Sequence, residues 1–276
     1  MHALGVSAHV MSRGYDKGCI FTDACDYERY LAILADGLQR FGVDCHALCL
    51  LWNHLHLVVT PWDSPLASLM QQVNSHYCEW LNQRHRRSGY VLQGRYKCKV
   101  VEDGSYFLNV IRYVVLNPVA AETVRTPVDW PWSSYRATMG LDASPVPLNV
   151  ERIWKSLDAA TEREGRERLR VFIESGDRPE ALWGPLIEGS ERFRDQLAPL
   201  LQPHQGTCEF TYAHRFASRP SLASLLSGVG DRGEREERAR VAFMHHAYTL
   251  AEIGKAWDLH PSTVWHWVRR ARQRCG

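Results

Sequence analysis

Several features that would assign this chain to a specialised class are missing from its 276 residues. It has no apolar run close to the roughly 18–20 residues that a membrane span needs. Its first residues do not show the charged-then-apolar pattern of a secretory signal, so we expect a cytoplasmic protein. The eight cysteines form no Cys-x-x-Cys pair, and their spacing fits neither a zinc knuckle nor a disulfide framework. We therefore expect reduced, mostly buried thiols.

A strong net charge is also missing, because 33 basic residues stand against 31 acidic ones. The basic residues are nevertheless concentrated in two segments. Residues 84–99 contain six Arg or Lys and no Asp or Glu, and residues 260–276 contain four Arg and no acid. Two basic segments in a balanced chain indicate a polyanionic partner. The alternative, two solvated faces with no ligand, has the same composition.

The spacing of apolar residues predicts an α+β domain in the first half of the chain. The expected order, β-α-β-β-α-β-α, fits a sheet with helices on one face. Strands are predicted at residues 5–14, 43–53, 54–60 and 90–101, and helices at residues 23–42, 65–88 and 103–118. Asp23 or Asp26 is predicted to cap the start of the first helix, and Ser64 to cap the second helix, which begins at Pro65. The third helix is predicted to stop at Asn117 and Pro118.

The sequence changes character after this domain. Residues 127–148 are rich in Pro and Trp and are predicted to form an ordered loop that closes the domain. The following residues look helical and mixed in charge. We therefore divide the chain into an α+β domain at 1–148, a helical connector at 149–205 and an all-helical region at 206–276.

The stretch LLWNHLHLVVT, residues 50–60, places two histidines in an otherwise apolar run. Alternate side chains of a strand share a face, so His54 and His56 project together while Leu55 points into the opposite layer. Two neighbouring neutral imidazoles suit a shared metal ion. The alternative is that both rings are hydrogen-bonded in a polar sheet face, and His-x-His alone does not decide.

Tyr113 and Asn117 lie four residues apart on the predicted third helix and therefore share a face. A tyrosine hydroxyl, with a pKa of about 10, attacks a phosphodiester poorly unless a divalent cation stabilises the developing charge. The two histidines and the amide oxygen of Asn117 could hold such a cation. Taken singly, Tyr113 reads as a boundary tyrosine and Asn117 as a helix C-cap. Their combination with His54, His56 and the basic segment favours a site.

Five segments carry a resemblance to a known family, and they occur in the expected order. They are HVMSRG, WNHLHLVVTP, LNQRHRRSGYVLQGRYKCKVV, YFLNVIRYVVLNPVAA and DWPWSSYRA. Over about residues 5–140 the chain resembles the IS200/IS605-like single-tyrosine transposases of the HUH superfamily, and most of all the REP-associated tyrosine transposases. The resemblance implies a catalytic domain at 1–148 with a ferredoxin-like antiparallel sheet and helices on one face.

The resemblance also implies a chemistry. Such proteins attack single-stranded DNA with a tyrosine, form a 5′-phosphotyrosine link, free a 3′-OH and later rejoin the strand. By position, Tyr113 is the nucleophile, and His54 and His56 hold Mg²⁺ or Mn²⁺. Asn117 stands where many insertion-sequence relatives have glutamine and corresponds to the third ligand. The implied substrate is a DNA hairpin flanked by a short single-stranded recognition sequence.

The basic residues of this half are candidates for gripping that DNA, mainly through phosphates, which supply affinity but little sequence information. Tyr90 and Tyr96 lie among these charges, where each either stacks on an unpaired base or packs into the core. The candidates are Arg13, Arg84, Arg86, Arg87, Arg95, Lys97 and Lys99.

The last part of the chain reads as a helix-turn-helix. Thr249 caps one helix, a turn follows at 258–260, and Pro261 opens a second helix that carries Arg269 and Arg270. The second helix would read duplex DNA, with Ser262, Thr263 and His266 exposed near its start. The alternative is a helical hairpin used for packing. The unit resembles the helix-turn-helix extension of replication-initiator type found in some REP-associated transposases.

Three functional hypotheses follow. The first is a metal-dependent enzyme that nicks and rejoins single-stranded DNA through Tyr113. The second is a DNA-binding protein that keeps the transposase fold without catalysis. The third is a metal-dependent hydrolase that uses the histidine pair without a covalent step. By resemblance we expect a monomer, with a dimer as the alternative.

Overall fold

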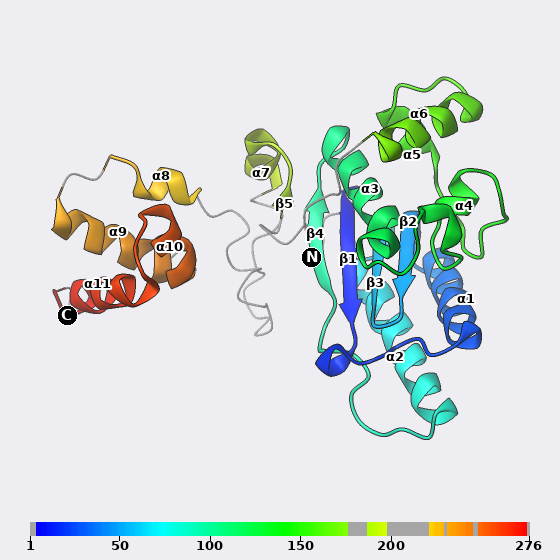
Figure 1. The fold of residues 1–276 in the computed structure, drawn as a ribbon, viewed down its shortest axis with the longest axis horizontal. Coiled ribbons are helices and arrows are strands. Elements are labelled where there is room, and N and C mark those ends of the chain that lie inside the picture. Colours follow the sequence, from blue (N-terminus) through cyan, green and yellow to red (C-terminus); the bar gives the residue numbers. More distant parts are fainter. Residues whose placement is uncertain (1–3, 176–186, 198–220, 229–230, 245–247, 275–276) are drawn as a thin grey trace. The chain divides into compact units, whose positions relative to one another are not determined.

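The structure is a computed structural model that describes residues 4–175, 187–197, 221–228, 231–244 and 248–274 (Figure 1). It divides into two compact units, Met1–Arg194 and Asp195–Gly276. The predicted boundaries at 148 and 205 differ from this division, because helices beyond residue 148 pack against the sheet domain. Among the described residues, no helix is long and apolar enough to cross a membrane.

The first unit is built on one sheet with strand order β2-β3-β1-β4-β5. The first four strands in that order pair antiparallel, and the two-residue β5 pairs parallel with β4 at the edge. The strands are β1 (Ser7–Arg13), β2 (Val43–Leu51), β3 (His54–Pro61), β4 (Lys97–Val101) and β5 (Ile187–Glu188). The predicted α+β class, an antiparallel sheet followed by a helical region, is confirmed.

Helices cover both faces of this sheet rather than one, so that part of the prediction was wrong. Leu55 and Leu57 point to α1 and α2, whereas Cys49 and Val58 point to α3, α5 and α6. Because β1, β2 and β3 are apolar on both sides, each face needs its own helical layer. The helices are α1 (Ala24–Arg40), α2 (Leu66–Arg84), α3 (Ser105–Ala120), α4 (Tyr135–Thr138), α5 (Glu151–Ser156), α6 (Glu162–Glu174) and α7 (Glu191–Leu197).

Several predicted element ends shift in the structure. The Asp23 side chain caps α1 by accepting a hydrogen bond from the Asp26 N–H, which confirms Asp23 as the cap rather than Asp26. Pro65, not Ser64, is the N-cap of α2. The helix α3 continues past Pro118 to Ala120, because the loss of one N–H donor does not stop the next turn: the Ala121 N–H still reaches the Asn117 carbonyl at 2.9 Å.

The predicted strand at 90–101 shortens to the five residues of β4. Residues 90–96 instead form a loop that bonds to the chain after β1, where the Tyr15 N–H donates to the Val91 carbonyl at 2.9 Å. Gly94 has φ +80°, which turns the chain before the strand begins. Two short 3₁₀ helices, η1 (Tyr15–Lys17) and η2 (Pro127–Asp129), lie in connecting segments.

The Pro- and Trp-rich loop is ordered, as predicted, and it runs along the outer edge of β2. The Trp132 carbonyl accepts from the Leu50 N–H at 2.9 Å, and the Trp130 indole donates to the Leu50 carbonyl at 2.9 Å. These bonds satisfy backbone groups of an edge strand that would otherwise be open to another chain.

The second unit is a small helical domain with its own apolar core. Its helices are α8 (Leu222–Leu226), α9 (Arg232–Met244), α10 (Leu250–Ala256) and α11 (Pro261–Arg274). Ile253, Val264 and Val268 lie at its centre and are almost fully buried. Thr249 caps α10 and α11 begins at Pro261, both as predicted, and Glu252 completes a reciprocal capping box with Thr249.

Candidate functional site

The strand register places both histidines of β3 under α3. His56 lies opposite Met11 of β1, and His54 lies opposite Arg13. His56 is 1% exposed, His54 is half-buried, and their ring centroids are 5.1 Å apart. Leu55 between them is buried in the opposite layer. The predicted sharing of one sheet face is therefore confirmed.

Tyr113 reaches this histidine pair from α3. Its ring centroid lies 5.5 Å from that of His56, edge to face, and the side chain is half-buried. Burial raises the pKa of Tyr113, and a hydrogen bond with Asn117 opposes this rise. The phenol therefore stays protonated near neutral pH, so a nucleophilic role requires a group that stabilises the charge on its oxygen or on the substrate.

Asn117 also faces the site, and it is not a helix C-cap. Its Nδ2 donates to the Tyr113 carbonyl at 3.3 Å, which turns the amide oxygen toward β3. That Oδ1 atom lies 3.5 Å from His54 Nε2, and the side chain is buried. The i, i+4 spacing that suggested a shared face thus places the amide one turn beyond Tyr113 and above His54.

The orientation of His54 is set by its neighbour in the chain. Asn53 Nδ2 donates to the Lys17 carbonyl at 3.1 Å, so Asn53 Oδ1 faces His54 Nδ1 at 2.7 Å and accepts a hydrogen bond from it. A neutral His54 then carries a lone pair on Nε2, opposite the lone pairs of Asn117 Oδ1. In that tautomer His54 Nε2 and Asn117 Oδ1, 3.5 Å apart, both offer lone pairs that a cation could share.

A third histidine, His9 of β1, completes the buried part of the site and was missed from the sequence. Its Nε2 lies 2.9 Å from His56 Nδ1, and its ring is 5.7 Å from that of Tyr113. The available signal was its place in the HVMSRG segment, two residues before Met11 on the same strand face. The register that brings β1 beside β3 decides the contact.

All three imidazoles are held neutral. Burial, and then the charge of Lys99, lower the pKa of His9 to about 3. Burial also holds the pKa of His56 well below its usual value and lowers the pKa of His54. Neutral imidazole is the form that ligates a metal.

The donor atoms available here, two imidazole nitrogens and one amide oxygen, could hold a divalent cation with an open coordination sphere. Within the described residues, no group of three or more His, Cys, Asp or Glu could hold a metal. The candidate set is instead two imidazoles, His54 and His56, with the amide oxygen of Asn117. Such a sparse set leaves positions for water and for phosphate oxygens.

Basic side chains lie beside the site, although not all of those predicted. Arg13 is the register partner of His54, and its Nε atom is buried without a hydrogen-bond partner among the described residues. Lys99 is the register partner of His9. Arg84 is different: it forms ion pairs with Asp23 and Asp26 and lies over the Trp80 ring. Arg86, Arg87, Arg95 and Lys97 are exposed.

Tyr90 and Tyr96, the two tyrosines of the basic segment, differ in burial, and each fits one of the two predicted alternatives. Tyr96 packs against the core formed with α1 and α2. Tyr90 is 83% exposed, and its ring centroid lies 6.4 Å from that of exposed Tyr15. Sequence reasoning missed Tyr15, which η1 brings beside the loop. The pair presents two aromatic faces close to the end of β1.

The second unit has the geometry of a helix-turn-helix. A Cβ on Gly254 would lie 2.5 Å from the Leu259 carbonyl, so the turn between α10 and α11 passes too close for a larger residue. Ser262 and His266 of α11 are exposed and Thr263 is half-buried. Arg269 is exposed, whereas Arg270 pairs with the buried carboxylate of Glu236 at 3.4 Å.

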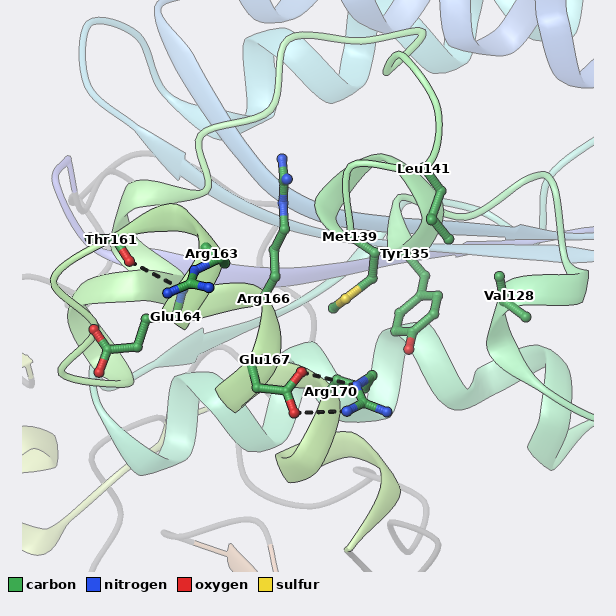
Figure 2. Close-up of a pocket in the computed structure, with 10 residues that line it drawn as sticks. All are labelled: Val128, Tyr135, Met139, Leu141, Thr161, Arg163, Glu164, Arg166, Glu167 and Arg170. Carbon is green, nitrogen blue, oxygen red and sulfur yellow. Dashed lines mark hydrogen bonds and ion pairs between the residues drawn. The ribbon is translucent and has the colours of Figure 1, made fainter.

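A separate cavity of about 940 Å³ lies between the α4 region and α6 (Figure 2). Its lining includes Tyr135, Met139 and Leu141 together with arginines and glutamates of α6. Arg166 and Arg170 already pair with Glu162 and Glu167. The cavity includes neither Tyr113 nor the histidines, and its paired charges do not form a catalytic group.

Comparison with known families identifies two parts of the chain. Residues 3–117 match the family described as IS200-like transposases. Residues 232–274 match a homeodomain-like domain, in agreement with the helix-turn-helix geometry. The sequence matched none of the curated proteins with which it was compared.

Two solved structures are similar to the chain at low identity. One is a REP-associated tyrosine transposase bound to a REP hairpin, with 16% identity and a TM-score of 0.44, covering 54% of this chain and 90% of that one. The other is a regulator of polyketide synthase expression from Bifidobacterium adolescentis, with 9% identity and a TM-score of 0.26, covering 97% and 75%. At these TM-scores neither likeness carries an argument about activity. The family comparisons therefore show a likeness to IS200-like transposases over residues 3–117 and to a homeodomain-like domain over residues 232–274.

Proposed function

We propose that the first unit nicks and rejoins single-stranded DNA through a 5′-phosphotyrosine intermediate on Tyr113. One observation carries the proposal: α3 and β3 bring Tyr113 and Asn117 beside His54 and His56, with the Tyr113 and His56 ring centroids 5.5 Å apart and His54 Nε2 3.5 Å from Asn117 Oδ1. A phenol beside a cation-binding set is suited to attack a phosphodiester.

The reaction exchanges one phosphodiester for another. The Tyr113 oxygen forms a bond to phosphorus, the bond from phosphorus to the 3′ oxygen breaks, and the phenolic proton is transferred in net to that oxygen, giving a free 3′-OH. Bound at His54, His56 and Asn117, Mg²⁺ or Mn²⁺ would neutralise charge on the phosphate oxygens. Rejoining is the reverse attack by a 3′-OH, which releases Tyr113.

The residues around the site position the DNA strand. Beside His54, the buried Nε of Arg13 has no hydrogen-bond partner among the described residues, which suits a phosphate oxygen next to the scissile bond. The exposed Tyr15 ring lies two residues after β1, and the exposed Tyr90 ring lies on the loop that bonds to this part of the chain. An unpaired base can stack on these rings. We propose single-stranded DNA flanking a hairpin as the substrate, in line with the motif resemblance.

For the second unit we propose binding to duplex DNA through α11. Exposed Arg269 and the exposed start of that helix support this role, while Glu236 holds Arg270 in an ion pair. A monomer in the cytoplasm remains our prediction for the whole protein.

The test is a denaturing gel of protein mixed with labelled hairpin DNA from the flanks of its own gene, with Mn²⁺ or with chelator. Wild type should give a metal-dependent covalent band, and Tyr113→Phe should give none while still binding the DNA. Tyr106→Phe removes a hydroxyl from the same helix and should leave the band unchanged. Cleavage without an adduct that survives in Tyr113→Phe would move the chemistry to a metal-activated water. Metal-independent binding without cleavage of the hairpin or its flanks would favour a non-catalytic binder.

A further inference from the structure

One buried side chain contacts the site without belonging to its donor set. His9 is 5% exposed, and its single side-chain hydrogen bond within the described residues joins His9 Nε2 to His56 Nδ1 at 2.9 Å. The two residues are 47 positions apart and lie on neighbouring strands. The proposed reaction assigns His9 no step, so the contact requires another explanation.

We propose that His9 is a positioning residue that holds His56 in the tautomer and orientation needed to bind the divalent cation, a role that rests on the proposed function of Tyr113. A neutral imidazole has one N–H and one lone pair. In the bond between His9 and His56, one ring must donate and the other must accept. When His56 Nδ1 donates, His56 Nε2 keeps its lone pair for the cation.

The opposite arrangement would close the site. If His9 Nε2 carried the proton, His56 Nδ1 would accept the hydrogen bond. The single N–H of neutral His56 would then lie on Nε2, which excludes a cation there. Cation binding therefore selects the state in which His9 accepts. A metal-ligating histidine usually has such a partner on its other ring nitrogen.

The rings around His56 restrict its rotation as well. The His9 ring stacks on it with an interplanar angle of 25° and a centroid distance of 5.1 Å. The rings of His54 and Tyr113 stand edge to face against it at 86° and 89°. Loss of the His9 ring would therefore remove both the acceptor and one wall of the slot that holds His56.

His54 is also held by a hydrogen-bond acceptor on its Nδ1, but this acceptor is an asparagine rather than a histidine. Its Nδ1 donates to Asn53 Oδ1 at 2.7 Å, and the backbone carbonyl of Lys17 fixes that amide. Each of the two candidate histidine ligands thus has one dedicated acceptor on Nδ1. For His54 the acceptor comes from the adjoining turn, and for His56 it comes from β1.

The experiment measures Mn²⁺ binding to the full chain by electron paramagnetic resonance, without DNA, for wild type and His9 variants. His9→Leu should weaken Mn²⁺ binding by about 10- to 100-fold. His9→Gln places an amide oxygen where Nε2 was and should stay within about threefold of wild type, because it still accepts one hydrogen bond. His46→Gln, at another buried histidine, is the control and should bind as wild type does.

A second readout separates positioning from a general loss of structure. Adduct formation by His9→Leu should recover toward the wild-type rate at saturating Mn²⁺, and binding of hairpin DNA in chelator should be unchanged. If His9→Leu does not fold, His9→Asn replaces it: its amide is too short to reach Nδ1 of His56, so it should lose affinity as leucine does while remaining polar.

The outcomes are distinct. Wild type that binds Mn²⁺ and forms adducts, with His9→Leu or His9→Asn binding as tightly as wild type, overturns the role of His9 and leaves the proposed function standing. Equal losses in His9→Gln and the other His9 variants also overturn it, because an acceptor would then not restore binding. Wild type that neither binds Mn²⁺ nor forms an adduct overturns the proposed function itself, and the role of His9 with it.

Discussion

Two buried histidines lie under α3, His46 against Phe107 and His56 against Tyr113, and their ring nitrogens are used differently. In His46 both nitrogens are occupied: Nδ1 donates to the Asn149 carbonyl and Nε2 bonds Thr60 Oγ1, each at 2.8 Å. In His56 only Nδ1 has a hydrogen-bond partner among the described residues. A histidine with a free lone pair toward a half-buried nucleophile can act as a ligand, and one with two partners cannot.

The network around His46 closes on itself. Thr60 Oγ1 also bonds Ser7 Oγ at 3.1 Å and accepts from Arg152 at 3.2 Å, and Arg152 pairs with Asp103. These bonds tie β1, β2, β3 and α5 together. The His46 end of the sheet therefore contributes to stability, and the His56 end leaves its donor atoms available for chemistry.

The largest expected effect is on catalysis. His54→Ala should reduce the rate of adduct formation by about 1,000-fold, because it removes a ligand of the group that stabilises transition-state charge. His54 is half-buried and belongs to no closed network, so the free energy of unfolding should change by less than about 1 kcal/mol. Single-turnover gels and urea denaturation measure the two quantities. A loss of stability without a loss of rate would reverse the comparison.

The next effect is on stability. His46→Ala should lower the free energy of unfolding by about 2–3 kcal/mol, because it leaves the Asn149 carbonyl and the Thr60 hydroxyl without their partner in a buried setting. Adduct formation per folded molecule should be unchanged at a temperature well below the transition. Urea denaturation followed by tryptophan fluorescence provides the measurement. A variant as stable as wild type would show that the network does not hold the strands together.

The third effect is on the pH dependence of stability. The folded pKa of His9, His46, His54 and His56 is lowered, chiefly by burial, so the unfolded chain binds protons more readily below pH 6.5. Their contribution to stability is complete above that pH and is lost as the pH falls through the folded values. Each histidine adds at most about 1.4 kcal/mol per pH unit to this slope.

The pH experiment follows urea denaturation between pH 7.5 and 5 in wild type and in His46→Gln. At pH 7.5 the free energy of unfolding of the variant should be lower than that of wild type. Its decrease with falling pH should be shallower by the equivalent of about one proton. Mn²⁺ affinity should be level near pH 7 and fall only below pH 6.5, since protons and cation compete for His54 and His56. An unchanged slope in His46→Gln would place the acid sensitivity elsewhere.

The smallest effect belongs to the solvent-facing end of the His46 network. Asp103 pairs with Arg152 at 2.8 Å, but 59% of its side chain is exposed. Asp103→Asn should therefore change the free energy of unfolding by less than about 1 kcal/mol, and less still in high salt. A loss as large as that of His46→Ala would mean that Arg152 depends on this carboxylate for its position beside Thr60.

Much of this protein follows from its sequence alone. Alternation along a strand required His54 and His56 to share a face and Leu55 to leave it, and a four-residue helical spacing required Tyr113 and Asn117 to lie together. The apolar runs predicted the element order, and the Thr249 to Pro261 pattern predicted the helix-turn-helix. Local periodicity and capping determine these features, because they depend on neighbours in the chain.

The tertiary structure decided the rest. The β1–β3 register placed His9 against His56, and the crossing of α2 over α1 drew Arg84 into its pairs with Asp23 and Asp26. The second helical layer appeared because both faces of the central strands are apolar, a property that alternation alone does not show. The spacing from His54 singled out His56 in the sequence, but it did not show that both ring nitrogens of His46 are occupied, since the partners of His46 lie more than a dozen residues away. Those partners are set by how strands and helices pack, and packing joins residues that local sequence keeps apart.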